Sequence, residues 1–214
     1  MKLVALSNVI GRSLPYYLAV EEWVAQHLPA NDYLFAWQVD SSVICGRHQL
    51  MELEVDMAFC REHGIEVWRR RGGGGAVYAD KNNLMFSYVT NRRGNKGCFD
   101  IYTRAMCKML GGIGICAAPT GRNDIEIEGR KLAGNAFYGL AGRSIVHGTM
   151  LYDADLEMMS GALTPSRAKL SAKGVKSVPK RITTLKEQGI NMSIDEFCDY
   201  ALKTLCVDGK VDIS

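Results

Sequence analysis

Four consecutive glycines, Gly72–Gly75, stand between two segments rich in β-forming residues and constrain the fold more than any other feature of this chain. Ordering a glycine costs more conformational entropy than ordering any other residue, so an ordered run implies a specific use. Successive backbone N–H groups in such a turn form a concave site for an anion such as phosphate. Three arginines, Arg69–Arg71, precede the run and offer fixed charge and bidentate donors. The segment therefore predicts a phosphate site.

The run matches neither of the two common phosphate-binding glycine motifs. No Lys-Ser/Thr pair follows the glycines, as a Walker A loop requires, and Val77 occupies the last glycine position of a GxGxxG pattern. A flexible turn beside a solvated arginine face is the plainer interpretation. The apolar strand expected directly after the glycines argues against simple flexibility.

The rest of the chain predicts strands and helices without strict β-α-β alternation. We expect an α+β fold, in which a mixed, mostly antiparallel sheet carries flanking helices. The expected strands are Tyr33–Gln38, Ser42–Cys45, Ile65–Arg69, Ala76–Tyr78, Leu84–Thr90, Ile113–Ala117, Asp124–Ile127, Lys131–Tyr138 and Ile145–Leu151. The expected helices are Tyr16–Leu28, Val55–His63, Phe99–Leu110, Leu156–Leu163 and a last one that starts at the capping box Ser193–Glu196.

Composition excludes several functional classes. A chain of 214 residues with 47% hydrophobic residues can bury the core of one domain, and a net charge of +3 is too small to indicate nucleic-acid binding. The seven cysteines contain no CxxC pair and the four histidines have no metal-ligand spacing, so we expect no zinc site and a reducing, cytoplasmic location. No apolar stretch has membrane-spanning length, so no membrane partner is expected.

Lys131 is the second residue of chemical interest. It follows a tight turn and alternates with Ala133, Asn135 and Phe137 on one face of its predicted strand. A lysine among small residues leaves room for a ligand, and its charge can offset the repulsion between a carboxylate and an α-phosphate, as acyl-adenylate formation requires. An exposed hairpin lysine is the alternative.

Polar residues near Lys131 extend this hypothesis. Asp124 could hold Mg²⁺ or a ribose hydroxyl, and Asn123 could donate to a phosphate. His147, in the next predicted strand, is a candidate for catalysis, although a single histidine in an apolar strand is more often a core residue.

Taken together, these segments resemble the lipoate–protein ligase family, within the larger group of biotin/lipoate ligases and lipoyl or octanoyl transferases. The matching segments occur in the family's order over roughly residues 14–185. They are Leu18–Glu22, Val43–Gln49, Arg69–Asp80, Gly121–Asp124, Lys131–Ala136, His147–Leu151 and Lys173–Ser177.

The resemblance implies a biotin/lipoate ligase-like catalytic domain that uses ATP and Mg²⁺ to convert lipoate to lipoyl-AMP. The lipoyl group then passes to a lysine of an acceptor, which is a lipoyl domain of a 2-oxoacid dehydrogenase E2 or the glycine-cleavage H protein. Lys131 is implied as the catalytic residue and Asp124 as the metal ligand. The implied nucleotide contacts are Arg70, Gly75, Ala76, Val77, Tyr78, Asn83, Asp124 and Lys131. The implied acyl contacts are Gly73, Gly74, Lys131, Ala136 and His147.

The chain departs from the family pattern in three places. Ala79 replaces a common histidine before Asp80, and Gly72 replaces a common serine before the remaining glycines. Bacterial relatives often carry a small C-terminal accessory domain, whereas this chain ends at Ser214, soon after its last predicted helix. We therefore expect a single catalytic domain over residues 1–214 without the accessory domain, which a separate subunit could supply.

Other functions remain open at this stage. An octanoyltransferase of this fold places a cysteine nucleophile downstream of the lysine motif, but no cysteine lies between Cys116 and Cys198. A biotin ligase has a shorter glycine motif. A lipoyl transferase using a preformed activated donor, or a non-catalytic module that binds lipoyl domains or nucleotide, would be consistent with Ala79. Retention of Lys131 argues against the non-catalytic module.

One basic segment suggests how an acceptor is recognised. Its cations are Lys169, Lys173, Lys176, Lys180 and Arg181. A solvated basic face is the plain interpretation. We hypothesise that this segment docks an acidic lipoyl domain, since opposite charge raises encounter rates.

Overall fold

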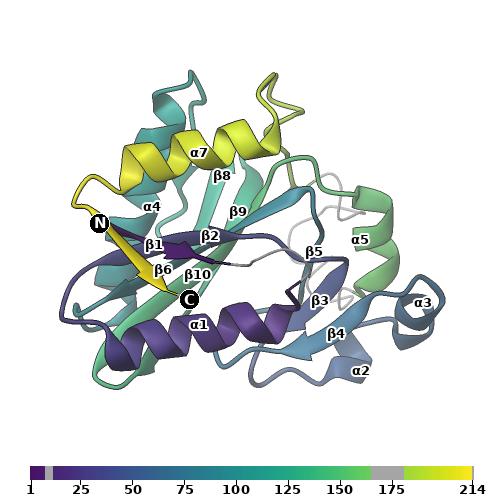
Figure 1. Cartoon of the computed structure of the whole chain (residues 1–214). Coiled ribbons are helices and arrows are strands. Elements are labelled where there is room, and N and C mark those ends of the chain that lie inside the picture. The colour runs from purple at the N-terminus through teal and green to yellow at the C-terminus, as the bar shows by residue number, and fades with distance from the viewer. Residues whose placement is uncertain (8–11, 165–180, 214) are drawn as a thin grey trace.

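The computed structural model describes residues 1–7, 12–164 and 181–213, so most of the basic segment and the Lys173–Ser177 motif lie outside the described residues. An eight-stranded sheet and a three-stranded sheet are flanked by helices (Figure 1). In chain order the elements are β1 (Lys2–Leu6), α1 (Leu14–His27), β2 (Tyr33–Trp37), β3 (Ser42–Cys45), α2 (Met51–Glu54), α3 (Met57–Glu62), β4 (Glu66–Arg69), β5 (Val77–Ala79), β6 (Asn83–Thr90), α4 (Asn95–Gly111), β7 (Ala118–Pro119), β8 (Asp124–Ile127), β9 (Arg130–Leu140), β10 (Arg143–Leu151), α5 (Leu156–Ala162), α7 (Ile194–Leu205) and β11 (Lys210–Ile213).

The large sheet has the strand order β11-β1-β2-β6-β10-β9-β8-β7. Strand β1 pairs in parallel with β2 and β11, and the other pairs are antiparallel. The expected α+β class and its mixed, mostly antiparallel sheet are confirmed. Helix α1 covers one face, and α4 and α7 cover the other (Figure 1). The central strands β6 and β10 are consequently buried along their whole length.

Alternate side chains of β6 contribute to the two core clusters on opposite faces of the large sheet. Leu84, Phe86 and Tyr88 pack in the core cluster beneath α4 and α7, whereas Met85 and Val89 pack in the cluster beneath α1. Successive side chains of a strand point to opposite faces, so a strand covered on both sides reads as continuously apolar.

The small sheet has the order β4-β3-β5, with β4 parallel and β5 antiparallel to β3. A third core cluster joins it to α3 and α5. The glycine run connects β4 to β5, and β5 leads directly to β6 of the large sheet. The run therefore lies where the two sheets meet.

Several expected elements differ from the structure. Strands β1 and β11 and helix α2 are not among the expected elements, and β2 and β3, which follow each other in the chain, belong to different sheets. The strand expected at Ile113–Ala117 is wrong. The amides of Ile113 and Ile115 both donate to Leu110 O as the last turn of α4 closes, and Gly114 has a φ of +82°, so these residues form no ladder.

The start of the last helix agrees with the sequence signal. The capping box at the start of α7 is confirmed, since the Ser193 hydroxyl accepts from Glu196 N while the Glu196 carboxylate accepts from Ser193 N. Within the described part of the chain, every helix is too short or too polar to span a bilayer.

Candidate functional site

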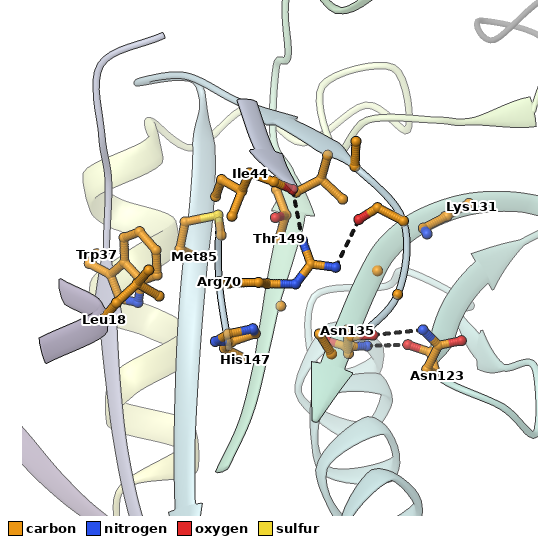
Figure 2. A pocket seen from close by; sticks show the side chains of 17 residues that line it. Leu18, Trp37, Ile44, Arg70, Met85, Asn123, Lys131, Asn135, His147 and Thr149 are labelled. Atoms are coloured by element: carbon orange, nitrogen blue, oxygen red, sulfur yellow. Dashed lines mark hydrogen bonds between the residues drawn. The ribbon is translucent and has the colours of Figure 1, made fainter. Parts of the chain in front are cut away.

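A pocket opens where the small sheet meets the large sheet, and it collects side chains from α1, both sheets and the glycine run. Its polar side carries Lys131, Asn123 and Asn135, and its apolar side carries Leu18, Trp37 and Met85 (Figure 2). Arg70 and His147 lie between these two sides. The remaining lining residues are Ile44, Gly74, Gly75, Ala76, Val77, Gly134, Ala136, Gly148 and Thr149.

Lys131 is held in place by an acidic partner and by a missing side chain. Its Nζ lies 3.0 Å from Asp124 Oδ1, across the β8–β9 hairpin. A Cβ on Gly134 would overlap Lys131 Nζ and crowd its Cε, so only glycine leaves the lysine in this position. The Lys131 side chain is about one-third exposed and lines the pocket, so it is both anchored and accessible.

The expected face of the Lys131 strand is partly wrong. Ala133 and Phe137 pack in the core cluster beneath α4 and α7, whereas Lys131 and Ala136 line the pocket. Ile125 and Glu126 of β8 are consecutive but pair with Ala133 and Lys131 of β9, so β9 has one extra residue there and simple alternation fails beside the lysine. The expectation that the lysine lies among small residues is nevertheless confirmed at Gly134, which is directly beside its side chain.

A reciprocal pair of amides closes the polar side of the pocket. Asn123 Nδ2 donates to Asn135 O, and Asn135 Nδ2 donates to Asn123 O, each at 2.6 Å (Figure 2). The residue opposite Asn135 on β10 is Gly148, whose missing Cβ leaves space that the Asn135 side chain fills. These bonds fix the loop before β8 against β9 and so support the position of Asp124.

The glycine run is shaped by the buried guanidinium of Arg70. Arg70 Nη1 donates to Ile44 O at 2.7 Å, and Nη2 donates to Gly73 O and Gly75 O at 2.7 and 2.8 Å. Burial lowers the pKa of Arg70 to about 10, a value at which the group stays charged near neutral pH. One side chain thus gathers three backbone carbonyls and turns the run into a defined loop.

A second glycine lets the loop approach β3. A Cβ on Gly46 would overlap Gly74 O, and Arg47 N donates to Gly72 O at 2.9 Å. Gly74 itself has a φ of +92°, a conformation that other residues rarely adopt. The contacts around the glycine run therefore hold it in one conformation, and the interpretation as a flexible turn does not apply.

A network of buried polar groups lies beneath the pocket. Glu21 of α1 is fully buried, and its carboxylate accepts from Ser87 Oγ at 2.5 Å and from Tyr138 Oη at 2.9 Å. His147 Nδ1 lies 2.9 and 3.0 Å from the two Glu21 oxygens. Trp37 Nε1 donates to Ser87 Oγ at 2.8 Å. Burial, with the adjacent Glu21 charge, raises the pKa of Tyr138, so its hydroxyl stays a donor.

The structure gathers most of the residues implied as site residues. Arg70, Gly74, Gly75, Ala76, Val77, Lys131, Ala136 and His147 all line the pocket, and Asp124 touches it through Lys131. Gly73 and Tyr78 do not line it; Tyr78 is buried, with its hydroxyl 3.2 Å from Ser41 Oγ. Asn83 is also outside the lining and fully buried, and its side-chain amide has no partner among the described residues.

Sequence reasoning missed the apolar side of the pocket and the buried acid beneath it. Leu18 and Glu21 belong to the Leu18–Glu22 segment that carries the family resemblance, but the sequence assigns no role to either residue. Trp37 and Met85 looked like ordinary strand residues, since nothing local distinguishes a core side chain from one that lines a cavity.

Comparisons with known proteins agree with this geometry. The sequence model of the family described as "Lipoyl protein ligase A/B catalytic domain" matches residues 14–206. The chain belongs to this family. Lipoate–protein ligase 1 of Staphylococcus aureus is 36% identical over 99% of this chain and 65% of its own length. This member of the lipoyl protein ligase family thus spans less than two thirds of that relative.

Two solved structures of lipoate–protein ligases share the fold. One is described as a bi-partite lipoate protein ligase with its E2 lipoyl domain, from Thermoplasma acidophilum; it matches with a TM-score of 0.82 and 29% identity, over 99% of this chain and 86% of that one. The other is described as lipoate–protein ligase A bound with ATP, and matches with a TM-score of 0.80 and 25% identity, over 100% of this chain and 89% of that one. The resemblance seen in the sequence is therefore confirmed at the level of family and fold.

Proposed function

We propose that this domain activates lipoate with ATP to form lipoyl-AMP and then transfers the lipoyl group to a lysine of an acceptor protein. The observation that carries the proposal is one pocket in which an anchored, accessible lysine faces an ordered glycine loop and an apolar recess. A carboxylate and a triphosphate must meet beside a fixed cation, while the acyl chain needs apolar walls. The names of the relatives support the same substrates.

Lys131 takes the central role in this mechanism. A lipoate carboxylate oxygen attacks the α-phosphorus of ATP, pyrophosphate leaves, and negative charge builds on the α-phosphate oxygens. The Lys131 ammonium can contact both the carboxylate and the α-phosphate and so offset their repulsion. In the second step the uncharged amine of an acceptor lysine attacks the acyl carbon, and AMP leaves. Asp124 positions Lys131 for both steps.

The glycine loop is the proposed nucleotide cradle. Gly75, Ala76 and Val77 line the pocket directly after the loop, where backbone N–H groups can receive phosphate oxygens. Both Nη atoms of Arg70 donate to backbone carbonyls. We therefore propose that Arg70 mainly shapes the cradle and adds positive charge near the phosphates. Tyr78 and Asn83 remain proposed contacts that lie behind the lining.

The site offers one carboxylate, that of Asp124, as a protein ligand for Mg²⁺. Within the described residues no group of three or more histidine, cysteine or acidic side chains gathers in one place. Mg²⁺ is commonly held by one or two carboxylates together with substrate phosphates, so Asp124 alone is a sufficient protein ligand. Bound there, the ion would neutralise phosphate charge. Asp124 would then divide its oxygens between the metal and Lys131.

The acyl chain is assigned to the apolar side of the pocket. Leu18, Trp37 and Met85 provide its walls, next to Ala136 and His147. Gly74, which lines the pocket, and Gly73 beside it stay proposed acyl contacts. We propose as acceptors the lipoyl domains of E2 subunits, as in the described T. acidophilum system, and the glycine-cleavage H protein. We also propose a cytoplasmic location, because all seven cysteines are free thiols.

A thioester route is disfavoured by the pocket. No cysteine is among the described residues that line it. Cys45 is fully buried on the neighbouring strand β3, and burial raises the pKa of its thiol, which disfavours the nucleophilic thiolate. The second candidate is transfer from preformed lipoyl-AMP, which would be consistent with Ala79 in place of the family's common histidine.

ATP–pyrophosphate exchange with lipoate, octanoate and biotin tests the proposal. We expect exchange with lipoate, and a mass increase of one lipoyl group on a lipoyl domain incubated with the protein, ATP, Mg²⁺ and lipoate. Exchange with biotin alone would contradict the assignment. Absence of exchange with all three acids, together with transfer from synthetic lipoyl-AMP, would reduce the function to transfer.

Gly134→Ala provides a milder test of the Lys131 position. The new methyl would overlap Lys131 Nζ, and a displacement of about 1 Å at a reacting group can cost roughly a hundredfold in rate. We expect slower adenylate formation with nearly unchanged thermal stability, because only the end of a flexible side chain must move. Gly139→Ala on the same strand is the control, since its nearest neighbour is Arg143 O at 3.7 Å. Equal rates in the two variants would contradict the assignment.

A further inference from the structure

Lys131 lies in the least regular part of the β8–β9 hairpin. The extra residue in β9 interrupts the ladder, and only two residue pairs follow before the turn, Glu126–Lys131 and Ile127–Arg130. An extra residue disrupts pairing locally, so these two pairs hold the tip of the hairpin only weakly. The ammonium of Lys131 is tied to Asp124, which belongs to the same hairpin and would move with it. The position of the lysine therefore depends on contacts to β9 from outside the hairpin.

Such contacts come from the chain that follows residue 181. Strand β10 pairs with β9 only as far as Ala133. Beyond that point Ile182 takes the place beside Lys131, in a parallel bridge. Thr183 N donates to Lys131 O at 2.9 Å. A short segment distant in sequence thus continues the sheet at the residue on which the proposed chemistry depends.

This segment has its own anchors in the core. Leu185 is fully buried in the cluster beneath α4 and α7, and Ile182 packs in the cluster that joins the small sheet to α3 and α5. Leu185 N also donates to Leu151 O at 2.9 Å, at the end of β10. The segment is therefore held independently of the hairpin and can serve as a fixed support for it.

The Glu187 carboxylate joins this segment to the tip of the hairpin. One of its oxygens lies 2.7 Å from Arg130 Nη1, and the other accepts from Thr183 Oγ1 at 2.9 Å. The hydrogen bond from Arg130 lowers the pKa of Glu187, so the pair is ionised near neutral pH. Arg130 directly precedes Lys131 and is not among the described residues that line the pocket. The ion pair thus holds the neighbour of the lysine and leaves the pocket open.

We propose that Glu187 is a positioning residue for the reaction: through Arg130 it clamps the tip of the hairpin to the segment that pairs with Lys131. The clamp fixes the ammonium relative to the reacting carboxylate and α-phosphate. The inference rests on the proposed function and adds to it a residue outside the pocket lining. Loss of the clamp should therefore slow the chemical step and leave substrate binding almost unchanged.

Glu187→Gln removes the charge and keeps the shape of the side chain. We expect kcat for lipoate-dependent pyrophosphate exchange to fall roughly tenfold, with KM values for ATP and lipoate within about twofold of the parent. The loss is smaller than the cost of a full displacement, because Thr183 N still holds Lys131 O. Asp40→Asn is the control, since Asp40 also forms an ion pair, 2.6 Å from Lys81, but lies outside the pocket lining. Equal kcat in the two variants would overturn the proposal.

A double variant separates positioning from general destabilisation. If Glu187 acts only through the lysine, adding Glu187→Gln to Lys131→Ala should not lower the residual exchange further. A loss of similar size in both backgrounds would show a purely structural role and overturn the assignment. Arg130→Met should reproduce the loss seen in Glu187→Gln, whereas Arg130→Lys can still pair with Glu187 and should retain more of the parental kcat.

Hydrogen exchange gives a readout that does not depend on activity. The Thr183 amide reports on the hydrogen bond to Lys131 O, and the Leu185 amide reports on the bond to Leu151 O of β10. In Glu187→Gln we expect faster exchange at Thr183 and unchanged exchange at Leu185, because only the tip of the hairpin is released. Equal protection of the Thr183 amide in parent and variant would contradict the clamp.

These measurements separate this inference from the proposed function. If the parent protein shows no pyrophosphate exchange but transfers the acyl group from synthetic lipoyl-AMP, adenylation fails. A roughly tenfold slower transfer in Glu187→Gln would then still support the clamp, since Lys131 contacts the same groups in both steps. If the parent exchanges pyrophosphate and Glu187→Gln loosens the Thr183 amide without lowering kcat, the proposed function stands and this inference fails.

Discussion

Replacing Lys131 with alanine should lower lipoate-dependent ATP–pyrophosphate exchange by at least about a hundredfold, the scale reported for loss of a single charge-stabilising donor in an active site. Lys131 is the lining residue that carries a fixed charge at the polar side of the pocket, next to Asn123 and Asn135. Without it, a carboxylate and an α-phosphate must approach each other beside the carboxylate of Asp124, which adds a third negative charge. The barrier should therefore rise, while binding of uncharged parts of the substrates changes little.

The fold should tolerate this substitution. The Lys131 side chain is about one-third exposed, and its ion pair with Asp124 lies at the pocket surface, where such pairs contribute about 0–1 kcal/mol. Thermal unfolding monitored by circular dichroism checks this expectation. Lys81→Ala is the matched control, because Lys81 also forms an ion pair, 2.6 Å from Asp40, but is exposed and lies outside the pocket lining, so its loss should leave exchange unchanged. Exchange at the parental rate in Lys131→Ala would refute the mechanism.

Local signals in the sequence were sufficient for much of the fold. Strand β3 was bounded correctly and α7 was found from its capping box, because apolar runs and caps are local features. The sequence does not reveal β1 and β11 because they pair with each other across the length of the chain, and only β1 also pairs with β2. Short strands with partly exposed side chains have little local pattern to reveal them.

In the candidate site, too, some residues are recognisable from local sequence and others only from the folded structure. The glycine run and Lys131 can be recognised from the sequence, because four consecutive glycines, or a lysine among small residues, are unusual over a few residues. Glu21 gives no such signal, because its surroundings come from Ser87, Tyr138 and His147, which are distant in sequence. Its burial is a property of the packed fold, and only the structure reveals that this acid reaches the pocket through a histidine.

The glycine loop and Lys131 are held in place by different contacts. Substitutions can therefore affect nucleotide binding and the adenylation step separately. Lys131 is positioned by one ion pair and by the absence of a side chain at Gly134, both at the surface of the pocket. The loop is instead held from behind by Arg70 through three carbonyls. Loss of the lysine should therefore affect the reacting charges, whereas loss of the arginine should disorder the cradle itself.

Arg70→Ala should accordingly weaken ATP binding and also destabilise the protein. Removing a buried guanidinium leaves the carbonyls of Ile44, Gly73 and Gly75 without this donor, so we expect the free energy of unfolding to fall by about 2–4 kcal/mol. The loop would then pay the ordering entropy of its glycines when ATP binds, and the KM for ATP should rise by roughly tenfold or more. Pyrophosphate exchange at varied ATP concentrations and urea unfolding measure the two effects.

The neighbouring arginine offers a matched control for this prediction. Arg71 is 63% exposed and forms a 2.6 Å ion pair with Glu22, so Arg71→Ala should change the unfolding free energy by less than about 1 kcal/mol. Arg70→Lys is the second comparison: it keeps the charge, but a compact ammonium cannot reproduce the planar fork that serves three carbonyls. We expect its ATP dependence to lie closer to that of Arg70→Ala than to the parent. An ATP KM unchanged in Arg70→Ala would show that the loop is ordered without the arginine, and would remove Arg70 from the nucleotide site.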